Sequence, residues 1–376
     1  MKIVFVTRML AAYRAPVYER CLALGHDVCV VHFENRAYSK VKPPSETPFR
    51  ALAFRNWLPV FLERRGYFFS PILPFAAARE RGSHYVLEGE SNLLVNLLLV
   101  PLLSVRGCRF VWWSLGALPG KALTLRRRLM QPLVHCILSR AEAVACYSRF
   151  GRDYYAGLGI SESKLRVAYN ALGPAVVYRD LDENRAKSNA WVAQQGWDDR
   201  LRITYIGAIV SEKRPELLIE AAAEFQKRSN RKLGLCFVGE GAAVEACREL
   251  ARQWEVDACF VGRQDRWAAT YILAGHAVAI PGLGGLAINH AMMLGRPVIC
   301  GPADGTERDL VLDGETGCFL AAMDKDHLAE ALLKFEAERE GLAAMGERAK
   351  AHVDRVASLD GLVAALIETN TFSKKA

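Results

Sequence analysis

Short apolar runs of strand length recur along the chain, and segments long enough for a helix separate them. Parallel sheets produce this alternation, because the crossover between two parallel strands needs a dozen or more residues and is usually a helix. The sequence therefore predicts an α/β fold with two Rossmann-like, doubly wound domains in series. The expected strands are residues 2–6, 27–33, 85–89, 108–114 and 143–148 in the first half, and 201–207, 232–239, 258–262, 276–282 and 296–301 in the second.

A polar segment without clear periodicity separates the two series of strands. The chain has 376 residues, which suits two domains at roughly 100–200 residues each. We expect an N-terminal domain at 1–175, an irregular linker at 176–200 and a C-terminal domain at 201–376. The last helix is expected to pack back on the N-terminal domain.

Charge is distributed unevenly between the halves. Residues 1–180 hold 25 Lys and Arg against 12 Asp and Glu, a net charge of +13, and the remainder carries −5. No nucleic-acid motif accompanies the basic half, so nucleic acid is not an expected partner. Aromatic and basic residues mix at 56–75, which favours contact with an anionic membrane surface or a phosphorylated substrate. The alternative is a set of amphipathic helices packed on the core, with Arg64 and Arg65 in solvent.

The sequence also indicates where the protein is located and whether it needs a metal or another cofactor. The longest apolar run, 93–105, is shorter than the 20 or so residues of a membrane span and predicts a buried helix. The start of the chain is interpreted as a strand and not as a signal peptide. The ten cysteines lack Cys-x-x-Cys pairs and zinc-site spacing, which indicates reduced thiols and therefore a cytoplasmic protein. The inner face of the membrane is the alternative location within the cytoplasm. The Asp-x-Asp sequence at Asp180 lies in the expected linker and is not interpreted as a metal motif, so no metal or other cofactor is expected.

The stretch PGLGGLAINHAMMLGRPVIC, at 281–300, runs from a glycine-rich loop into a helix pattern and then into a strand. Glycines at 282, 284 and 285 allow close approach of the backbone and positive φ, and the following helix presents unpaired N–H groups. This combination suits a diphosphate. Tight packing without a ligand is the alternative explanation of such a turn.

A second loop supports the anion site. In residues 205–225 a strand ends at Gly207, and Lys213 and Arg214 come just before a helix that begins at Pro215. Cations at a helix start are opposed by the helix dipole, and a bound anion would resolve this conflict. Two solvated surface bases remain the alternative.

These segments together resemble a known family. YIGAIVSEKRPELLIEA, CFVGEG, CFVGR and PGLGGLAINHAMMLGRPVI followed by DGTERDLVLDGETGCFL are similar to the donor-binding domain of family 4 glycosyltransferases of GT-B fold. TRMLAAYRAPVYERCLALGHDVCVV, VWWSLG and AVACYSRFGRDYYAGLGISESKLRVAYNA resemble the first domain of that family. The similarity covers nearly the whole chain.

The resemblance implies which residues hold the nucleotide-sugar donor. Lys213 corresponds to the lysine that neutralises the donor diphosphate, and the phosphate amides fall at Gly284, Gly285 and Leu286. The family usually has an arginine where this chain has Ala208, so Arg214 is expected to substitute for it. The expected donor-binding set is Gly207, Lys213, Arg214, Gly239, Glu240, Arg263, Gly282, Gly284, Gly285, Leu286 and His290, with Lys213 and His290 as the catalytic candidates.

The sequence departs from the family at its pair of glutamates spaced Glu-x7-Glu. Gly282 stands where the first contacts the donor sugar, and His290 stands where the second binds the ribose. The imidazole of His290 can still hydrogen-bond a ribose hydroxyl or a phosphate oxygen. The alternative is that His290 is a helix residue without a role in binding. On the acceptor side we expect Tyr13, Arg14, Glu88, Asn92 and Ser114; Glu88 and Glu90 are equally consistent with solvated loop carboxylates.

The implied activity is transfer of a sugar from a nucleoside-diphosphate donor to a glycan or lipid-linked saccharide, with retention of anomeric configuration, in bacterial surface polysaccharide or glycoconjugate synthesis. In this mechanism the leaving diphosphate takes the acceptor proton, while Lys213 and the helix amides stabilise its charge. Two alternatives stay open: a nucleotide-sugar epimerase on the same scaffold, and a non-catalytic relative that binds nucleotide sugars.

Overall fold

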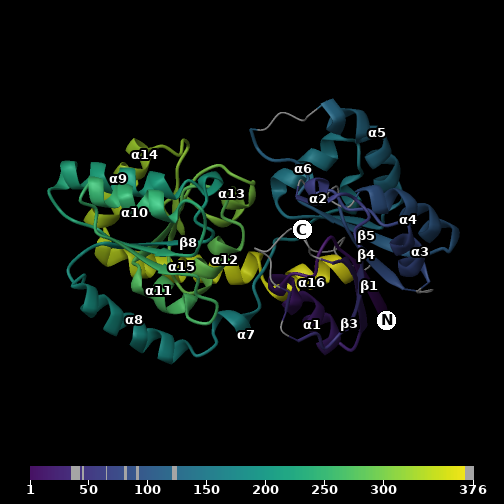
Figure 1. The fold of residues 1–376 in the computed structure, drawn as a ribbon, viewed down its shortest axis with the longest axis horizontal. Coiled ribbons are helices and arrows are strands. Elements are labelled where there is room, and N and C mark those ends of the chain that lie inside the picture. The colour runs from purple at the N-terminus through teal and green to yellow at the C-terminus, as the bar shows by residue number, and fades with distance from the viewer. Residues whose placement is uncertain are drawn as a thin grey trace. The chain divides into compact units, whose positions relative to one another are not determined.

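The computed structural model describes residues 1–34, 43–44, 46–64, 66–79, 83–89, 93–120 and 125–368. The chain forms two units, Met1–Asn170 with Leu359–Ala376 and Ala171–Ser358 (Figure 1). Each unit has a parallel sheet between layers of helices and its own hydrophobic core. The predicted fold class, two doubly wound α/β domains, is therefore confirmed.

The first unit is built on a sheet of parallel strands, ordered β3-β2-β1-β4-β5-β6-β7 in the described residues. All five strands expected in this half are present. The short strands β3 and β7 at the two edges were not predicted, because each has few residues and no fully buried face. The strands are β1 (Lys2–Val6), β2 (Asp27–Phe33), β3 (Arg50–Phe54), β4 (His84–Glu88), β5 (Arg109–Ser114), β6 (Ala143–Cys146) and β7 (Leu165–Val167).

Helices cover both faces of this sheet. On one face, α3, α4, α5 and α6 share a core with side chains from the strands. On the other face, α1 packs against α16 and β2. The helices are α1 (Ala15–Ala23), α2 (Val60–Arg64), α3 (Ile72–Ala78), α4 (Leu93–Val105), α5 (Leu125–Arg140), α6 (Arg149–Gly157) and α16 (Leu359–Ile367).

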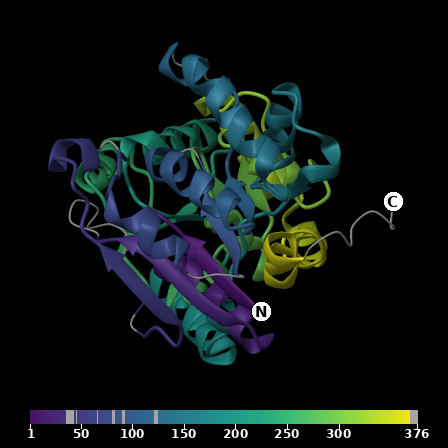
Figure 2. The ribbon, with the colours of Figure 1, turned by 90° about the vertical axis from the view of Figure 1, so that its right-hand side faces the viewer.

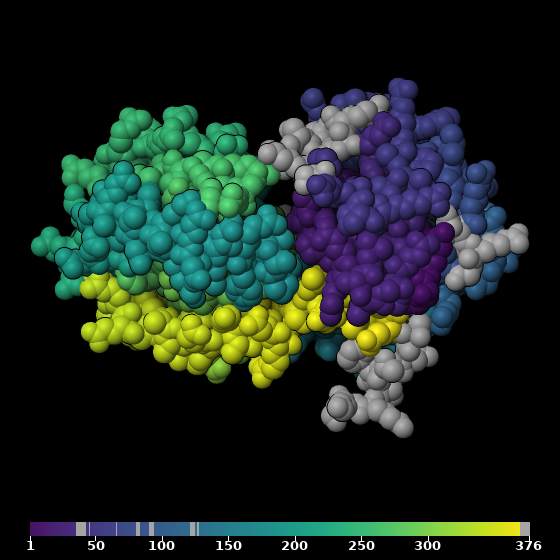
Figure 3. Space-filling model, turned by 90° about the horizontal axis from the view of Figure 1, so that it is seen from below, coloured from purple at the N-terminus to yellow at the C-terminus, as the bar shows by residue number. Residues whose placement is uncertain are grey.

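The C-terminal helix α16 completes the first unit although it is far away in sequence. Arg20 of α1 pairs with Asp360 at 2.6 Å, and the ring of His84 contacts the carbonyl oxygen of Leu366 at 2.8 Å. In the space-filling view of Figure 3 the yellow surface of α16 lies against the purple surface of the N-terminal residues. Helix α16 thus belongs to the same compact unit as the N-terminal residues.

The second unit has a sheet ordered β10-β9-β8-β11-β12-β13 in the described residues. Its five expected strands are present, and only the three-residue β13 was not predicted. Helices α9, α10 and α14 pack on one face; α8 packs on α11, and α12 on α15. The strands are β8 (Arg202–Ile206), β9 (Gly234–Val238), β10 (Ala258–Gly262), β11 (Ala277–Ile280), β12 (Val298–Cys300) and β13 (Gly317–Phe319). The helices are α7 (Pro174–Val177), α8 (Leu181–Gln195), α9 (Pro215–Ser229), α10 (Val244–Gln253), α11 (Ala268–Ala274), α12 (Leu286–Met293), α13 (Thr306–Leu310), α14 (Lys325–Ala337) and α15 (Leu342–Val356).

The segment expected to be an irregular linker is largely helix α8. Its buried face carries Asn184 and Ser188, so the apolar periodicity that normally identifies a helix is absent. Asn184 accepts a hydrogen bond from Thr270 of α11 at 2.7 Å. The expectation was wrong because part of the buried face of this helix is polar, although Val192 and Trp191 pack in an apolar cluster; the helix belongs to the second unit.

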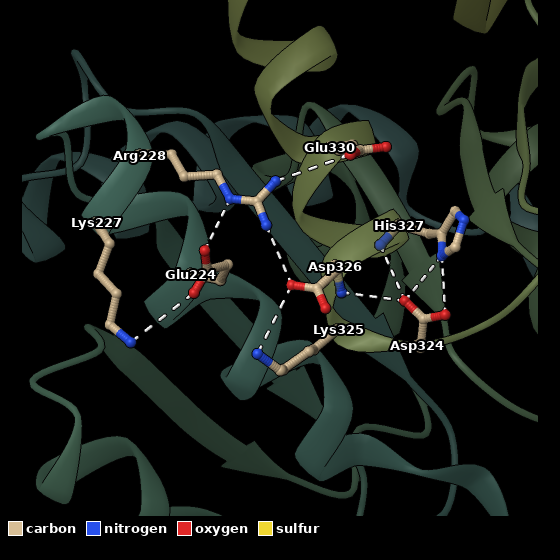
Figure 4. A network of polar contacts seen from close by, with 8 residues as sticks. All are labelled: Glu224, Lys227, Arg228, Asp324, Lys325, Asp326, His327 and Glu330. Atoms are coloured by element: carbon tan, nitrogen blue, oxygen red, sulfur yellow. Dashed lines mark hydrogen bonds and ion pairs between the residues drawn. The ribbon is translucent and has the colours of Figure 1, made fainter.

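A network of exposed ion pairs joins α9 to α14 (Figure 4). Arg228 contacts Glu224 at 2.8 Å, Asp326 at 3.1 Å and Glu330 at 3.9 Å. The side chain of Asp324 accepts from the backbone of Asp326 and His327 and so caps α14. Exposed pairs of this kind contribute little to stability individually. Buried residues shared by α9 and α14 provide the larger contribution.

No helix in the described ranges combines the length and the apolar character that crossing a membrane requires. The apolar run 93–105 is the helix α4, as predicted, but only one side of it is buried, since Leu94, Leu98 and Val105 are exposed. The ten cysteines form no disulfide.

Candidate functional site

The order of strands in the second unit defines where a ligand should bind. From β8 the chain proceeds to β9 and β10 on one side, whereas β11 leads to β12 and β13 on the other. In open α/β sheets, ligands bind outside the carboxyl ends of the two strands where the order reverses. The loops that leave β8 and β11 therefore flank the expected crevice. These are the two loops that the sequence selected.

The loop after β8 carries Lys213 towards the end of its own strand. Gly207 has φ +142°, and a Cβ atom there would lie 3.0 Å from Lys213 Nζ. Burial lowers the pKa of Lys213, and only Asp304 opposes this shift. Lys213 forms no hydrogen bond or ion pair through its ammonium group with the residues that the structure describes. It is a half-buried cation with no bonded counter-ion. Arg214 is exposed, with φ +51°.

The glycine loop after β11 packs directly on the Lys213 backbone. A Cβ atom at Gly282 would lie 2.7 Å from Lys213 Cα and 2.8 Å from its carbonyl carbon, closer than real Cβ contacts allow. A glutamate therefore cannot occupy position 282 with this backbone. The close approach of the two loops is thus a physical reason for glycine at position 282.

Helix α12 begins at Leu286, and no side chain within the described ranges caps its N-terminus. Its N-cap residue, Gly285, has φ +52° and ψ −134°, a conformation essentially restricted to glycine. A Cβ at Gly285 would meet no atom within 4 Å, so the space beside the helix start is open. Gly284 is packed on Ile288, at 3.0 Å from its would-be Cβ. Free amides, open space and a nearby cation together form a site for an anion.

His290 lies one turn into α12 and is half-buried. Burial lowers the pKa of its imidazole to about 4, so the ring is neutral at pH 7. Its ring makes no hydrogen bond with the residues that the structure describes. A neutral ring offers one donor and one acceptor to a ligand.

Two carboxylates that the sequence interpretation did not select lie in the loop after β12. Asp304 is close enough to Lys213 to raise the pKa of that lysine against the effect of burial. Glu307, on α13, is fully buried and accepts from the backbone N–H groups of Asp304 at 3.0 Å and Gly305 at 2.9 Å. Burial and the neighbouring Asp304 raise the pKa of Glu307 to about 7. The sequence signal that could have identified these two carboxylates is their position after the carboxyl end of β12.

The remaining donor candidates follow β9 and β10. A Cβ at Gly239 would lie 1.8 Å from the Gly207 oxygen, so the loops after β8 and β9 run against each other. Glu240 is exposed, and its carbonyl oxygen accepts from Ile209 N at 2.9 Å. Arg263 is also exposed and pairs with Asp265 at 2.7 Å. Since it follows the edge strand β10, it is the candidate furthest from the switch point between β8 and β11.

The first unit has a corresponding switch point between β1 and β4, where a buried charged cluster lies. Glu88, at the end of β4, accepts from Arg8 N at 2.6 Å and pairs with Arg8 Nε at 3.2 Å and Arg14 at 3.4 Å. Burial alone would raise the pKa of Glu88, but the two arginines lower it. Glu88 therefore holds the arginines and is not a solvated loop carboxylate.

Arg14 is the centre of this cluster. Its guanidinium lies over the ring of Trp113 at 4.7 Å and donates to Tyr147 at 3.0 Å. Burial raises the pKa of Tyr147, so its hydroxyl stays neutral, and two guanidinium groups face a single carboxylate. Arg14 Nε and Trp113 Nε1 are buried and have no hydrogen-bond partner among the residues that the structure describes. Arg8 and Tyr147 were not selected from the sequence.

The other acceptor-side candidates have different positions. Tyr13 is exposed, with its ring centre 5.7 Å from the Arg14 guanidinium. Ser114 is buried at the end of β5 and accepts from Gly116 N at 3.2 Å. Asn92 and Glu90 lie outside the described residues. In the described ranges no three His, Cys, Asp or Glu side chains gather as metal ligands.

Known proteins share this architecture. A glycosyltransferase from Rickettsia africae superposes with a TM-score of 0.74 at 13% identity, covering 96% of this chain and 95% of that one. The Anabaena protein HepE in complex with UDP gives 0.72 at 14% identity, covering 96% and 97%. HepE has also been solved with UDP-glucose, with a TM-score of 0.67 at 15% identity. The fold is that of the GT-B glycosyltransferases, as the sequence resemblance implied.

The second unit carries a family match of its own. Residues 187–352 match the family model "Glycosyl transferases group 1". Alpha-D-kanosaminyltransferase from Streptomyces kanamyceticus is 29% identical over 178 residues, which are 46% of this chain and 45% of that protein. The match thus spans about half the length of this curated relative.

Proposed function

We propose that the protein is a retaining glycosyltransferase that moves a sugar from a nucleoside-diphosphate donor to a saccharide or lipid-linked saccharide. Surface polysaccharide or glycoconjugate synthesis is the proposed context, with the acceptor presented at the inner face of an anionic membrane. The glycosyl transferases group 1 family and the GT-B fold support a glycosyl donor. The complexes of HepE with UDP and UDP-glucose support uridine as the first base to test.

The observation that carries the proposal is the cation at the switch point. Lys213 is half-buried, pairs with no described carboxylate, and lies between Gly207 and Gly282 beside the uncapped α12. A donor diphosphate supplies the missing counter-charge. During transfer, Lys213 and the α12 amides stabilise the charge that develops on the leaving diphosphate, which can take the acceptor proton on the same face.

The acceptor side is proposed to be the Arg8–Arg14–Glu88 cluster, with Tyr13 at its exposed edge. Glu88 positions the two arginines, and the excess positive charge of the cluster suits an acceptor that carries a phosphate or a carboxylate. A phosphate-linked lipid saccharide has this chemistry.

The test uses Lys213→Ala, with Lys232→Ala as the control because Lys232 is an exposed lysine of the same unit. We expect Lys213→Ala to lose most UDP affinity and most release of UDP from UDP-sugars, with unchanged unfolding, while Lys232→Ala matches the wild type. A wild-type kcat/KM in Lys213→Ala would contradict the assignment of Lys213 to donor binding. The anomeric configuration of the product, measured by NMR, tests retention; an inverted product contradicts it.

A second candidate, a non-catalytic binder of nucleotide sugars, is favoured by one observation. Both family glutamates are missing, and the packing at Gly282 leaves no room to restore the first. The same assay separates the two functions: a binder shows UDP affinity that depends on Lys213 but releases no UDP from any donor and acceptor pair.

A further inference from the structure

The outer surface of the first unit is unusually apolar where α3, α4 and α5 cover the sheet. Helix α3 packs on α4, and α4 on α5, so the three helices form one layer, visible in blue in Figure 2. Their inner sides join the core through Leu73, Leu99 and Leu138. We call their outer side the α3–α5 face. Its exposed apolar residues are Ile72, Phe75, Leu94, Leu98, Val105, Leu125, Leu129 and Leu133.

The helix α4 is apolar all round, which is typical of a helix that is buried on every side. Yet Leu94, Leu98 and Val105 form an outer stripe, and the Val105 side chain is 89% exposed. On α5, Leu125, Leu129 and Leu133 repeat at spacings of four residues and so lie on one side of the helix. Leu125 is 73% exposed and Leu129 72%. Contiguous exposure of this kind marks an interaction surface.

The charged residues within helices α3, α4 and α5 are all basic. The sequences of α3, α4 and α5 contain no Asp or Glu, whereas α5 alone contains four arginines. Among them Arg128 and Arg140 are exposed, as are Arg79 after α3 and Arg106 after α4. A second copy of the chain would place these arginines against one another in a symmetric contact. An apolar surface ringed by cations instead complements anionic lipid headgroups above an apolar interior.

We propose that the α3–α5 face docks on the surface of an anionic lipid bilayer. The leucines and Phe75 enter the boundary between headgroups and acyl chains, while the arginine side chains contact the headgroups. Docking on a bilayer would bring the enzyme to a lipid-linked acceptor, and this purpose rests on the proposed function. The docking surface itself is inferred from the exposed residues alone. The stretch 56–75, selected from the sequence, contributes Ile72 and Phe75; its exposed Trp57 and Phe61 lie outside the three helices.

The experiment is flotation of the full chain with vesicles of phosphatidylglycerol and phosphatidylcholine, or of phosphatidylcholine alone. The test variant is L125S/L129S. The matched control is L24S/V176S, which also removes two exposed apolar side chains, but from outside the three helices. We expect the wild type and the control to float with the anionic vesicles only, and L125S/L129S to bind at least about tenfold more weakly. Binding should fall at high salt, because salt screens the headgroup charge.

Affinity for UDP is measured on every variant. A thermal unfolding curve is recorded for every variant, because a wild-type curve shows that the first unit is folded. Equal UDP affinity separates this proposal from the donor-site proposal, which Lys213→Ala tests. Two results would overturn the docking surface: a wild type that does not float with anionic vesicles, or an L125S/L129S variant that floats as the wild type does. Arg128→Glu provides a second readout, with a reduced salt dependence expected; an unchanged salt dependence counts against the arginine contribution.

Discussion

Gly282→Ala tests the packing that links the two loops of the candidate donor site. A Cβ at position 282 would lie 2.7 Å from Lys213 Cα, whereas ordinary contacts begin at 3.4 Å. One loop must therefore move by about 0.7 Å, and overpacking of this kind costs roughly 1–3 kcal/mol of folding free energy. Because Lys213 Nζ is placed beside Gly207 by this same loop, the movement should also displace the ammonium group.

The matched control is Gly275→Ala, at the other end of the same strand. A Cβ there would lie 2.6 Å from the Thr204 hydroxyl oxygen, and Gly275 has φ −74°, so the substitution is crowded without backbone strain. Urea unfolding should show similar destabilisation of the two variants. Calorimetric titration with UDP should show a loss of at least about tenfold, or 1.4 kcal/mol, for Gly282→Ala only.

The reasoning is refuted if Gly282→Ala binds UDP as the wild type does, because the Lys213 loop then does not depend on the glycine. Gly282→Glu, which introduces the glutamate that the sequence resemblance implies at this position, should weaken UDP binding further. Improved binding in that variant would show that the glutamate can be accommodated.

Four further outcomes follow from the buried ionisable groups His290, Glu307 and Glu88. Because the pKa of His290 is about 4, the ratio of UDP affinities of wild type and His290→Ala should stay constant from pH 5.5 to 8; a hydrogen-bonding role through a charged ring predicts a change. With a single acceptor nitrogen, His290 should discriminate weakly against dUDP, and a preference for UDP above about 100-fold, roughly 2.7 kcal/mol, contradicts this. The pKa of Glu307 is raised in the folded state to about 7 from an ordinary 4.5, so its contribution to stability is lost as pH rises through 7. The loss is at most about 3 kcal/mol, and Glu307→Gln should flatten it in urea unfolding between pH 5 and 8. Glu88→Gln removes the carboxylate between Arg8 and Arg14 and should cost about 3–5 kcal/mol of stability; a cost under about 1 kcal/mol would show that the arginines are compensated by solvent.

The sequence predicted the elements whose signal is local. Strands such as 27–33 and 143–148 are short apolar runs, and the starts of α9 at Pro215 and α12 at Leu286 follow from proline and glycine placement. The failures have a common cause. Helix α8 buries asparagine and serine through contacts with another helix, and β3, β7 and β13 gain their strand partners only from the assembled sheets.

The candidate site divides in the same way. Residue types and spacing selected Lys213, the glycine loop and His290, because a strand followed by glycines and a helix start has few chemical uses. The close approach of Gly282 to the Lys213 backbone, the influence of Asp304 on Lys213 and the pairing of Glu88 with Arg8 were decided by the tertiary structure. These contacts join residues about 70 to 90 positions apart. Local patterns fix which segments become strands and helices, whereas the order of strands within a sheet decides which loops meet.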